Sequence, residues 1–265
     1  MTIFLRELKA HRLGLFFWCL GMVALVASGM GKFAAYKAAG QSVAALMADL
    51  PKMVLVVFGM SGFDLSKASG FYGVLFLYIA LMGAVHAALL GANLISKEER
   101  DRTSEFLFAK PIRRSSVLTS KLLAGLVNIV VLNLATSISS YYFVGYFGKG
   151  ESVNADITLM MAGLFFLQII FFSIGALVAG VVHKPKSAPS ISTSIMFLTF
   201  LVFYLVNLND KLDVLKYLTP FKYFDAAVLM ANGRLDPVYV VLSALIVGVA
   251  VFGAYHFYSG RDLTV

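Results

Sequence analysis

Six long apolar blocks constrain this chain more than any other feature of its sequence. They cover residues 13–30, 71–95, 117–147, 157–182, 191–208 and 238–258. Each block has at least about the 17 residues that a helix needs to cross a hydrocarbon core of about 30 Å. Backbone polar groups inside lipid must be bonded within their own segment, so each block is predicted to be a helix. The sequence therefore predicts an all-α, polytopic membrane protein whose six transmembrane helices form one domain over residues 1–265.

Composition and cysteine usage exclude several other classes. The chain is 60% hydrophobic and 14% charged, which is too apolar for a soluble domain of this length. Its one cysteine, Cys19, lies inside an apolar block, and its four histidines lack metal-ligand spacing, so we expect neither a disulfide framework nor a metal site. The net charge of +8 is assigned to contacts with an anionic lipid leaflet of the bilayer, and no nucleic acid is expected as a partner.

The basic residues predict the orientation of the chain. Short loops that stay in the cytoplasm carry an excess of Lys and Arg, and "HKPK" at 183–186 contrasts with "GKGESVNAD" at 148–156. With both termini cytoplasmic, the cytoplasmic basic residues are Arg6, Lys9, Arg12, Lys97, Arg100, Arg102, Lys110, Arg113, Arg114, Lys121, Lys184, Lys186 and Arg261. We expect a multi-pass protein of a prokaryotic cell membrane, either the plasma or the inner membrane.

The segment 41–60 is apolar but has Asp49, Pro51 and Lys52 at its centre. Burying the two charges at mid-bilayer would cost about 2.5–3.5 kcal/mol each. An amphipathic pair of short helices broken at Pro51 is therefore predicted between the first two spans, lying at the outer surface or dipping partway into the membrane. A seventh span is the alternative.

Polar groups inside the spans are few. The amides Asn128, Asn133 and Gln168 are candidates either for interhelical hydrogen bonds or for the lining of a substrate path. A ridge of alanine and glycine at 80–92 gives the second span a flat face, suited to packing within the chain or to a subunit interface. His86 is the one titratable residue near a span centre.

Sequence signatures of catalysis and of nucleotide binding are missing. The chain has no metalloprotease, nucleophile-elbow, dinucleotide-loop or phosphate-loop motif, so no catalytic residue is assigned and any ATP hydrolysis must belong to another polypeptide. A proton-coupled secondary transporter that uses His86, and a membrane anchor or assembly factor of another complex, are the alternative functions.

A charged segment at 96–116 separates the second and third spans, with ten charged residues between Ile95 and Ser116. Glu98 and Arg102 stand four residues apart, as in a helical ion pair, and Pro111 ends that helix before a second one begins at Pro111 or near Ser115. Orientation alone would need only basic residues. The interleaved acidic residues and the apolar run 106–108 therefore favour a site for a protein partner.

This segment resembles the first cytoplasmic region of ABC-2 type transporter permeases. The matching residues include Glu99, Thr103, Glu105, Pro111 and Arg114, and the amphipathic outer segment and "LTPFKYFDAAVL" extend the likeness along the chain. Arg102 departs from the glycine that the family usually has.

The resemblance implies a coupling helix that docks on a separate ABC ATP-binding subunit, which would hold the ATP and Mg²⁺, so this chain itself would carry no cofactor. It assigns the partner contacts to Glu98, Glu99, Arg100, Arg102, Thr103, Glu105, Phe106, Pro111, Arg113 and Arg114. It further implies an exporter in which this permease pairs with a second copy, as a homodimer, or with a related permease, as a heterodimer.

Overall fold

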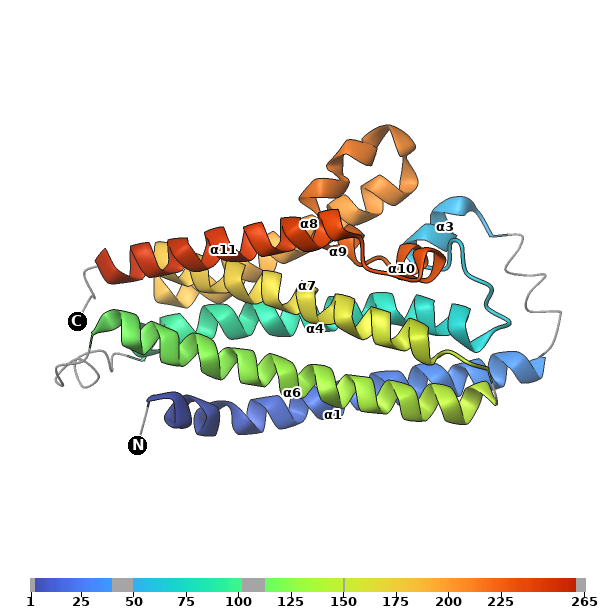
Figure 1. Cartoon of the computed structure of the whole chain (residues 1–265), viewed down its shortest axis with the longest axis horizontal. Helices are drawn as coiled ribbons and strands as arrows, with labels where there is room; N and C mark the ends of the chain where they lie inside the picture. The colour runs from blue at the N-terminus through green and yellow to red at the C-terminus, as the bar shows by residue number, and fades with distance from the viewer. Residues whose placement is uncertain (1–2, 40–49, 102–112, 150, 261–265) are drawn as a thin grey trace.

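A computed structural model of the chain describes residues 3–39, 50–101, 113–149 and 151–260. These residues are helical apart from turns and connections (Figure 1). The six long helices are α1 (Ile3–Ala39), α4 (Ala68–Arg100), α6 (Arg114–Gly148), α7 (Asn154–Val181), α8 (Ala188–Leu208) and α11 (Pro237–Gly260). Within the described ranges, six helical segments are long and apolar enough to cross a membrane, which confirms the prediction of an all-α protein with six candidate spans.

The helices α4 and α7 form the centre of the bundle. In each of these helices, 67% of the most apolar 18-residue stretch is buried, whereas the corresponding value for α1 and for α11 is 17%. The outer helices carry large apolar side chains on the surface, such as Phe17 on α1 and Phe252 on α11. In a protein that spans a bilayer, lipid tails or other subunits cover such side chains without the cost they would have in water.

Small residues allow α4 and α7 to approach backbone to backbone. A Cβ placed on Gly91 would lie 2.1 Å from the carbonyl oxygen of Phe172, and one on Gly175 would lie 2.5 Å from that of Ala88. Ala84, Ala87 and Ala88 are fully buried. The alanine and glycine ridge of the second span is therefore used for packing within the chain, where small side chains give the closest helix contact.

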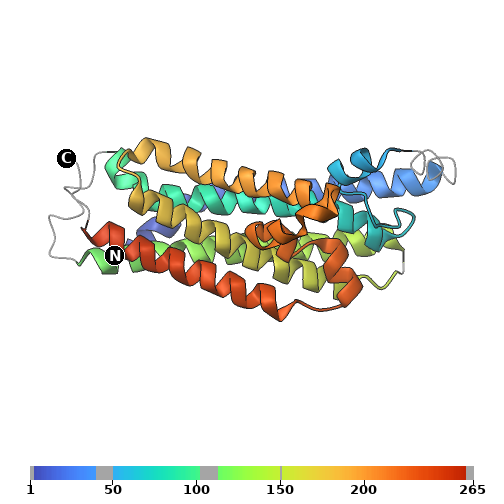
Figure 2. The ribbon, with the colours of Figure 1, turned by 90° about the horizontal axis from the view of Figure 1, so that it is seen from above.

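Successive long helices alternate in direction, so both ends of the described chain lie at one end of the bundle (Figure 2). The end of α4 at Arg100, the start of α6 at Arg114 and the turn η1 (Pro185–Ser187) share this end, which we call the terminal end. The helix α1 begins ten residues before the predicted span because its charged first turns continue the same helix beyond the apolar block.

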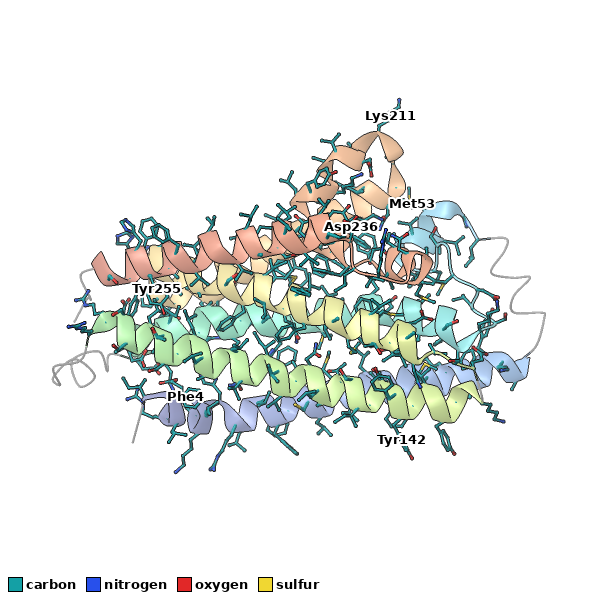
Figure 3. The ribbon with its side chains drawn as sticks, viewed as in Figure 1. Phe4, Met53, Tyr142, Lys211, Asp236 and Tyr255 are labelled. Carbon is teal, nitrogen blue, oxygen red and sulfur yellow. The ribbon has the colours of Figure 1, made fainter. Side chains whose placement is uncertain are left out.

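Short helices occupy the half of the bundle away from the termini. They are α3 (Lys52–Val57), η2 (Asp210–Leu218), α9 (Pro220–Tyr223) and α10 (Ala226–Asn232). Figure 3 shows Lys211 at the tip of the projecting η2 and Met53 on α3 in the same half, whereas Phe4 and Tyr255 lie near the terminal end. Burial raises the pKa of Tyr223 to about 12, so its phenol stays protonated and donates to the carbonyl of Tyr217.

The predicted break at Pro51 coincides with the start of α3, since Pro51 is its N-cap with extended backbone. The first half of the predicted amphipathic pair falls on residues 40–49, outside the described residues. Of that pair, the structure therefore describes one short helix.

The first turn of α4 is capped by a residue from a distant loop. Its N-cap, Lys67, makes no side-chain cap bond, and a carboxylate oxygen of Glu151 accepts from the Ala68 N–H at 2.7 Å. We expect Glu151→Ala to lower the free energy of unfolding by about 1 kcal/mol, as for loss of an N-cap. Denaturation in mixed micelles would measure this, with the exposed Asp213→Ala as the control; equal effects of the two changes would contradict the capping role.

Candidate functional site

A buried ion pair joins α4 to α6 at the terminal end. The Lys121 side chain is fully buried and its ammonium donates to the Glu98 carboxylate and to the Leu94 carbonyl oxygen. Glu98 is 6% exposed and also accepts from Arg6 of α1, at 3.3 Å. A buried charge needs an oppositely charged partner and hydrogen bonds, because burying an unpaired charge would cost several kcal/mol of folding free energy.

The first turns of α1 extend the charged group. Glu7 is fully buried, and its carboxylate lies 3.2 Å from the Arg6 guanidinium, 3.8 Å from the Lys97 ammonium and 3.8 Å from the His11 ring. We call Arg6, Glu7, Lys97, Glu98 and Lys121 the charge cluster. It connects three helices at the point where α4 ends and α6 begins.

The charge cluster changes the interpretation of the predicted partner contacts on α4. Glu98 and Glu99, both predicted as partner contacts, are 6% and 8% exposed in this chain. The Glu98 carboxylate is paired with Arg6 of α1 and Lys121 of α6. The role of these two residues in partner contact stays a prediction. Arg100 is partly exposed and bonds Asn93, at 2.8 Å, and Asp101.

The remaining predicted contacts fall on two groups. Arg113 is the exposed N-cap of α6, and Arg114 begins that helix with its guanidinium 3.5 Å from the Ser259 carbonyl oxygen of α11. The residues outside the described ranges are Arg102, Thr103, Glu105, Phe106 and Pro111. Because Arg102 is one of these residues, the predicted Glu98–Arg102 ion pair lies partly outside the described ranges and stays a prediction.

The three amides predicted as interhelical bonds or a substrate path lie inside the bundle. Asn133 of α6 donates to the Met161 carbonyl oxygen at 3.1 Å and to the Gln168 side chain at 3.3 Å, so this pair bonds α6 to α7. Asn128 donates to Ala124 of its own helix. It also lines a cavity of about 160 Å³ between α1, α4 and α6, and its role in a substrate path stays a prediction.

His86 lines the same cavity. It is 4% exposed, its ring centroid lies 5.1 Å from that of Trp18, and its Nδ1 has no hydrogen-bond partner in the described part of the chain. The cavity is polar and large enough for water, which is the usual partner of such a buried atom.

Sequence reasoning missed two members of the charge cluster. The sequence places Lys121 among the cytoplasmic basic residues and gives Glu7, which stands among the basic residues of the first segment, no role. The available signal was a single acidic residue, Glu7, six positions before a long apolar run, because burying an acidic side chain is costly unless a cation is close. The spacing in the sequence does not identify that cation.

The described residues include no group of three or more His, Cys, Asp or Glu side chains that could hold a metal ion. The fold and the charge cluster define a polytopic helical membrane protein whose described polar groups are used to hold helices together. The model of the ABC-2 family transporter proteins matches residues 1–263, so the chain belongs to this family. No curated protein matches the chain.

Family membership settles the class of activity. An ABC-2 permease is a non-catalytic transmembrane subunit, which confirms that this chain is not an enzyme. ATP binding in such transporters typically lies in separate ATPase subunits, and the family implies such a partner for this chain.

Proposed function

We propose that this chain is the permease subunit of an ATP-driven exporter and that its terminal end receives the motion of the ATP-binding subunit. The observation that carries this proposal is the charge cluster. Its ion pairs join α1, α4 and α6. The connection from α4 to α6 leaves α4 at Asp101 and reaches α6 at Arg113, close to these ion pairs. A force applied between these two residues would reach three helices at once.

The distribution of charge supports a cytoplasmic location for the terminal end. Arg6, Lys9 and Arg12 of α1 and Lys184 and Lys186 of the α7–α8 turn lie there, as the positive-inside rule requires of short cytoplasmic loops. Both termini would then be cytoplasmic, in the cell membrane of a prokaryote.

Dimer formation and the export direction belong to the proposal as well. Both come from the family resemblance, which implies two permeases, identical or related, on two ATPase subunits. Large apolar side chains on α1, α6 and α11 supply surface for a second permease as well as for lipid. The partner contacts at Arg102, Thr103, Glu105, Phe106 and Pro111 remain predictions.

Site-specific photocrosslinking tests the proposed contact. Arg113 and Lys149 are both exposed and flank the same helix, α6, at its two ends. A benzophenone amino acid at 113 should crosslink to the ATP-binding subunit, whereas the same group at 149, across the membrane, should not. The protein to co-express is the ATP-binding subunit that the family implies for this chain.

Three results would contradict the proposal. The first is a crosslink from position 149 and none from 113, which would reverse the orientation. The second is failure of the two proteins to co-purify, which would favour a membrane anchor of another complex. Transport that persists without an ATPase and is lost in His86→Ala would instead support a proton-coupled carrier.

A further inference from the structure

A cavity of about 220 Å³ lies at the end of the bundle opposite the termini. Four parts of the chain that are distant in sequence form its wall: the segment from α3 to α4, the first half of α4, the end of α8, and the α9–α10 region. The charge cluster is at the other end, so the cavity is separate from the site already described.

Five of the sixteen residues that line the cavity are phenylalanines. The rings of Phe63, Phe76, Phe203, Phe221 and Phe224 line it. Phe203 and Phe221 lie 6.4 Å apart by ring centroids, which places two of these rings in direct contact. A wall of this composition suits the apolar body of a small ligand, since ligand pockets are lined mainly by apolar and aromatic side chains with a few polar groups.

Two charged residues, Lys222 and Asp225, line the cavity, and the Lys222 ammonium lies 5.8 Å from the centroid of the Phe203 ring. The Lys222 ammonium donates to Asn207 at 2.6 Å and to Asp225 at 2.8 Å, which accounts for two of its three N–H groups. The other oxygen of Asp225 accepts from the Ala227 N–H at 3.1 Å. Because Asp225 already balances the charge of Lys222, the remaining N–H suits an uncharged acceptor better than an anion.

The size of the cavity limits the ligand. A cavity of about 150 Å³ holds benzene, and pockets for drug-sized molecules begin at about 300 Å³. A volume of about 220 Å³ lies between these values and suits a molecule of about two fused rings.

We propose that this cavity binds a small uncharged amphipathic molecule, with an apolar body of bicyclic size and one carbonyl or hydroxyl oxygen that accepts a hydrogen bond from Lys222. The site is formed by one chain and requires neither ATP nor a partner. A negative result for ligand binding at this cavity would therefore not contradict the proposed contact between the terminal end and the ATP-binding subunit.

The test measures binding of tritiated 2-acetylnaphthalene to the purified chain in lipid nanodiscs, with empty nanodiscs subtracted. Competition by 2-ethylnaphthalene, which lacks the carbonyl oxygen, and by 2-naphthoate, which is an anion, reports the chemistry of the site. We expect saturable binding, with the ketone at least about tenfold tighter than the hydrocarbon, as for one hydrogen bond to a charged donor. The carboxylate should be weaker than the ketone.

Variants separate the hydrogen bond from the cavity itself. The double change Lys222→Met with Asp225→Asn removes both charges but keeps an acceptor that can cap Ala227, and it should abolish the preference for the ketone. Lys216→Met, at a partly exposed lysine outside the cavity, is the matched control and should keep that preference. Ala80→Leu and Ala227→Leu fill the cavity from different segments and should each remove saturable binding.

Any of four results would overturn the proposal: no saturable binding, an unchanged ketone preference in the double variant, wild-type affinity in both filled variants, or tighter binding of 2-naphthoate than of the ketone. Thermal unfolding of each variant in nanodiscs verifies that the variants compared are folded.

Discussion

Replacing Lys121 with methionine is expected to lower the free energy of unfolding by about 3–5 kcal/mol. Lys121 is fully buried, and its loss leaves the Glu98 carboxylate, 6% exposed, without its principal cation. Removing one partner of a buried ion pair costs this much because the other charge stays out of water uncompensated. Unfolding of the purified chain in mixed micelles, followed by circular dichroism, measures the change.

Two further variants identify the cause of that loss. Adding Glu98→Gln to Lys121→Met removes the stranded charge and should recover most of the stability, because an uncharged, packed replacement of a buried pair is often neutral. Lys9→Met, at an exposed lysine of α1, should change stability by less than about 0.5 kcal/mol. A double variant no more stable than Lys121→Met alone would show that the ion pair is not what the single change destroys.

Replacing Gly91 with leucine should destabilise the bundle by at least about 3 kcal/mol. A Cβ at this position would lie 2.1 Å from the carbonyl oxygen of Phe172 and 3.0 Å from the amide nitrogen of Ala176. Overpacking a core usually costs about 1–3 kcal/mol when side chains can move aside, but here the obstacle is backbone of α7. The leucine side chain would force α4 and α7 apart. The yield of folded protein in the membrane should therefore fall.

Gly248→Leu is the matched control. It makes the same change in a long helix, α11, at an exposed glycine whose Cβ would meet no atom within 4 Å. We expect no loss of stability from it. Equal losses at the two positions would mean that the α4–α7 crossing is less close than the structure describes.

Several features of the bundle were predictable from the sequence. The number of spans follows from block length, because lipid requires each crossing segment to satisfy its own backbone hydrogen bonds. The start of a helix directly after Pro51 was predictable for a similarly local reason, since proline lacks a backbone donor and is tolerated only at the beginning of a helix. The terminal end was predictable as a place of charge, because Arg6, Lys97 and Arg113 stand beside apolar blocks.

The arrangement of the polar residues was not predictable in this way. Glu98 and Arg102 have the spacing of a helical ion pair, yet Glu98 is paired with Lys121 of the next span and with Arg6 of the first. Asn133 is similarly bonded to Gln168, 35 positions away. Such pairs depend on which faces of two helices pack together. The sequence periodicity of one helix does not identify the helix that packs against it.

The sequence by itself determined the class of protein, its six candidate spans and the absence of a nucleotide motif, because length and hydropathy act within single segments. Only the tertiary structure decided that the glycine and alanine face of α4 packs on α7, that Glu7 and Lys121 are buried, and that four distant segments enclose a cavity around Lys222. These features depend on contacts between helices, whose energies are set by distances of a few ångströms that no single segment encodes.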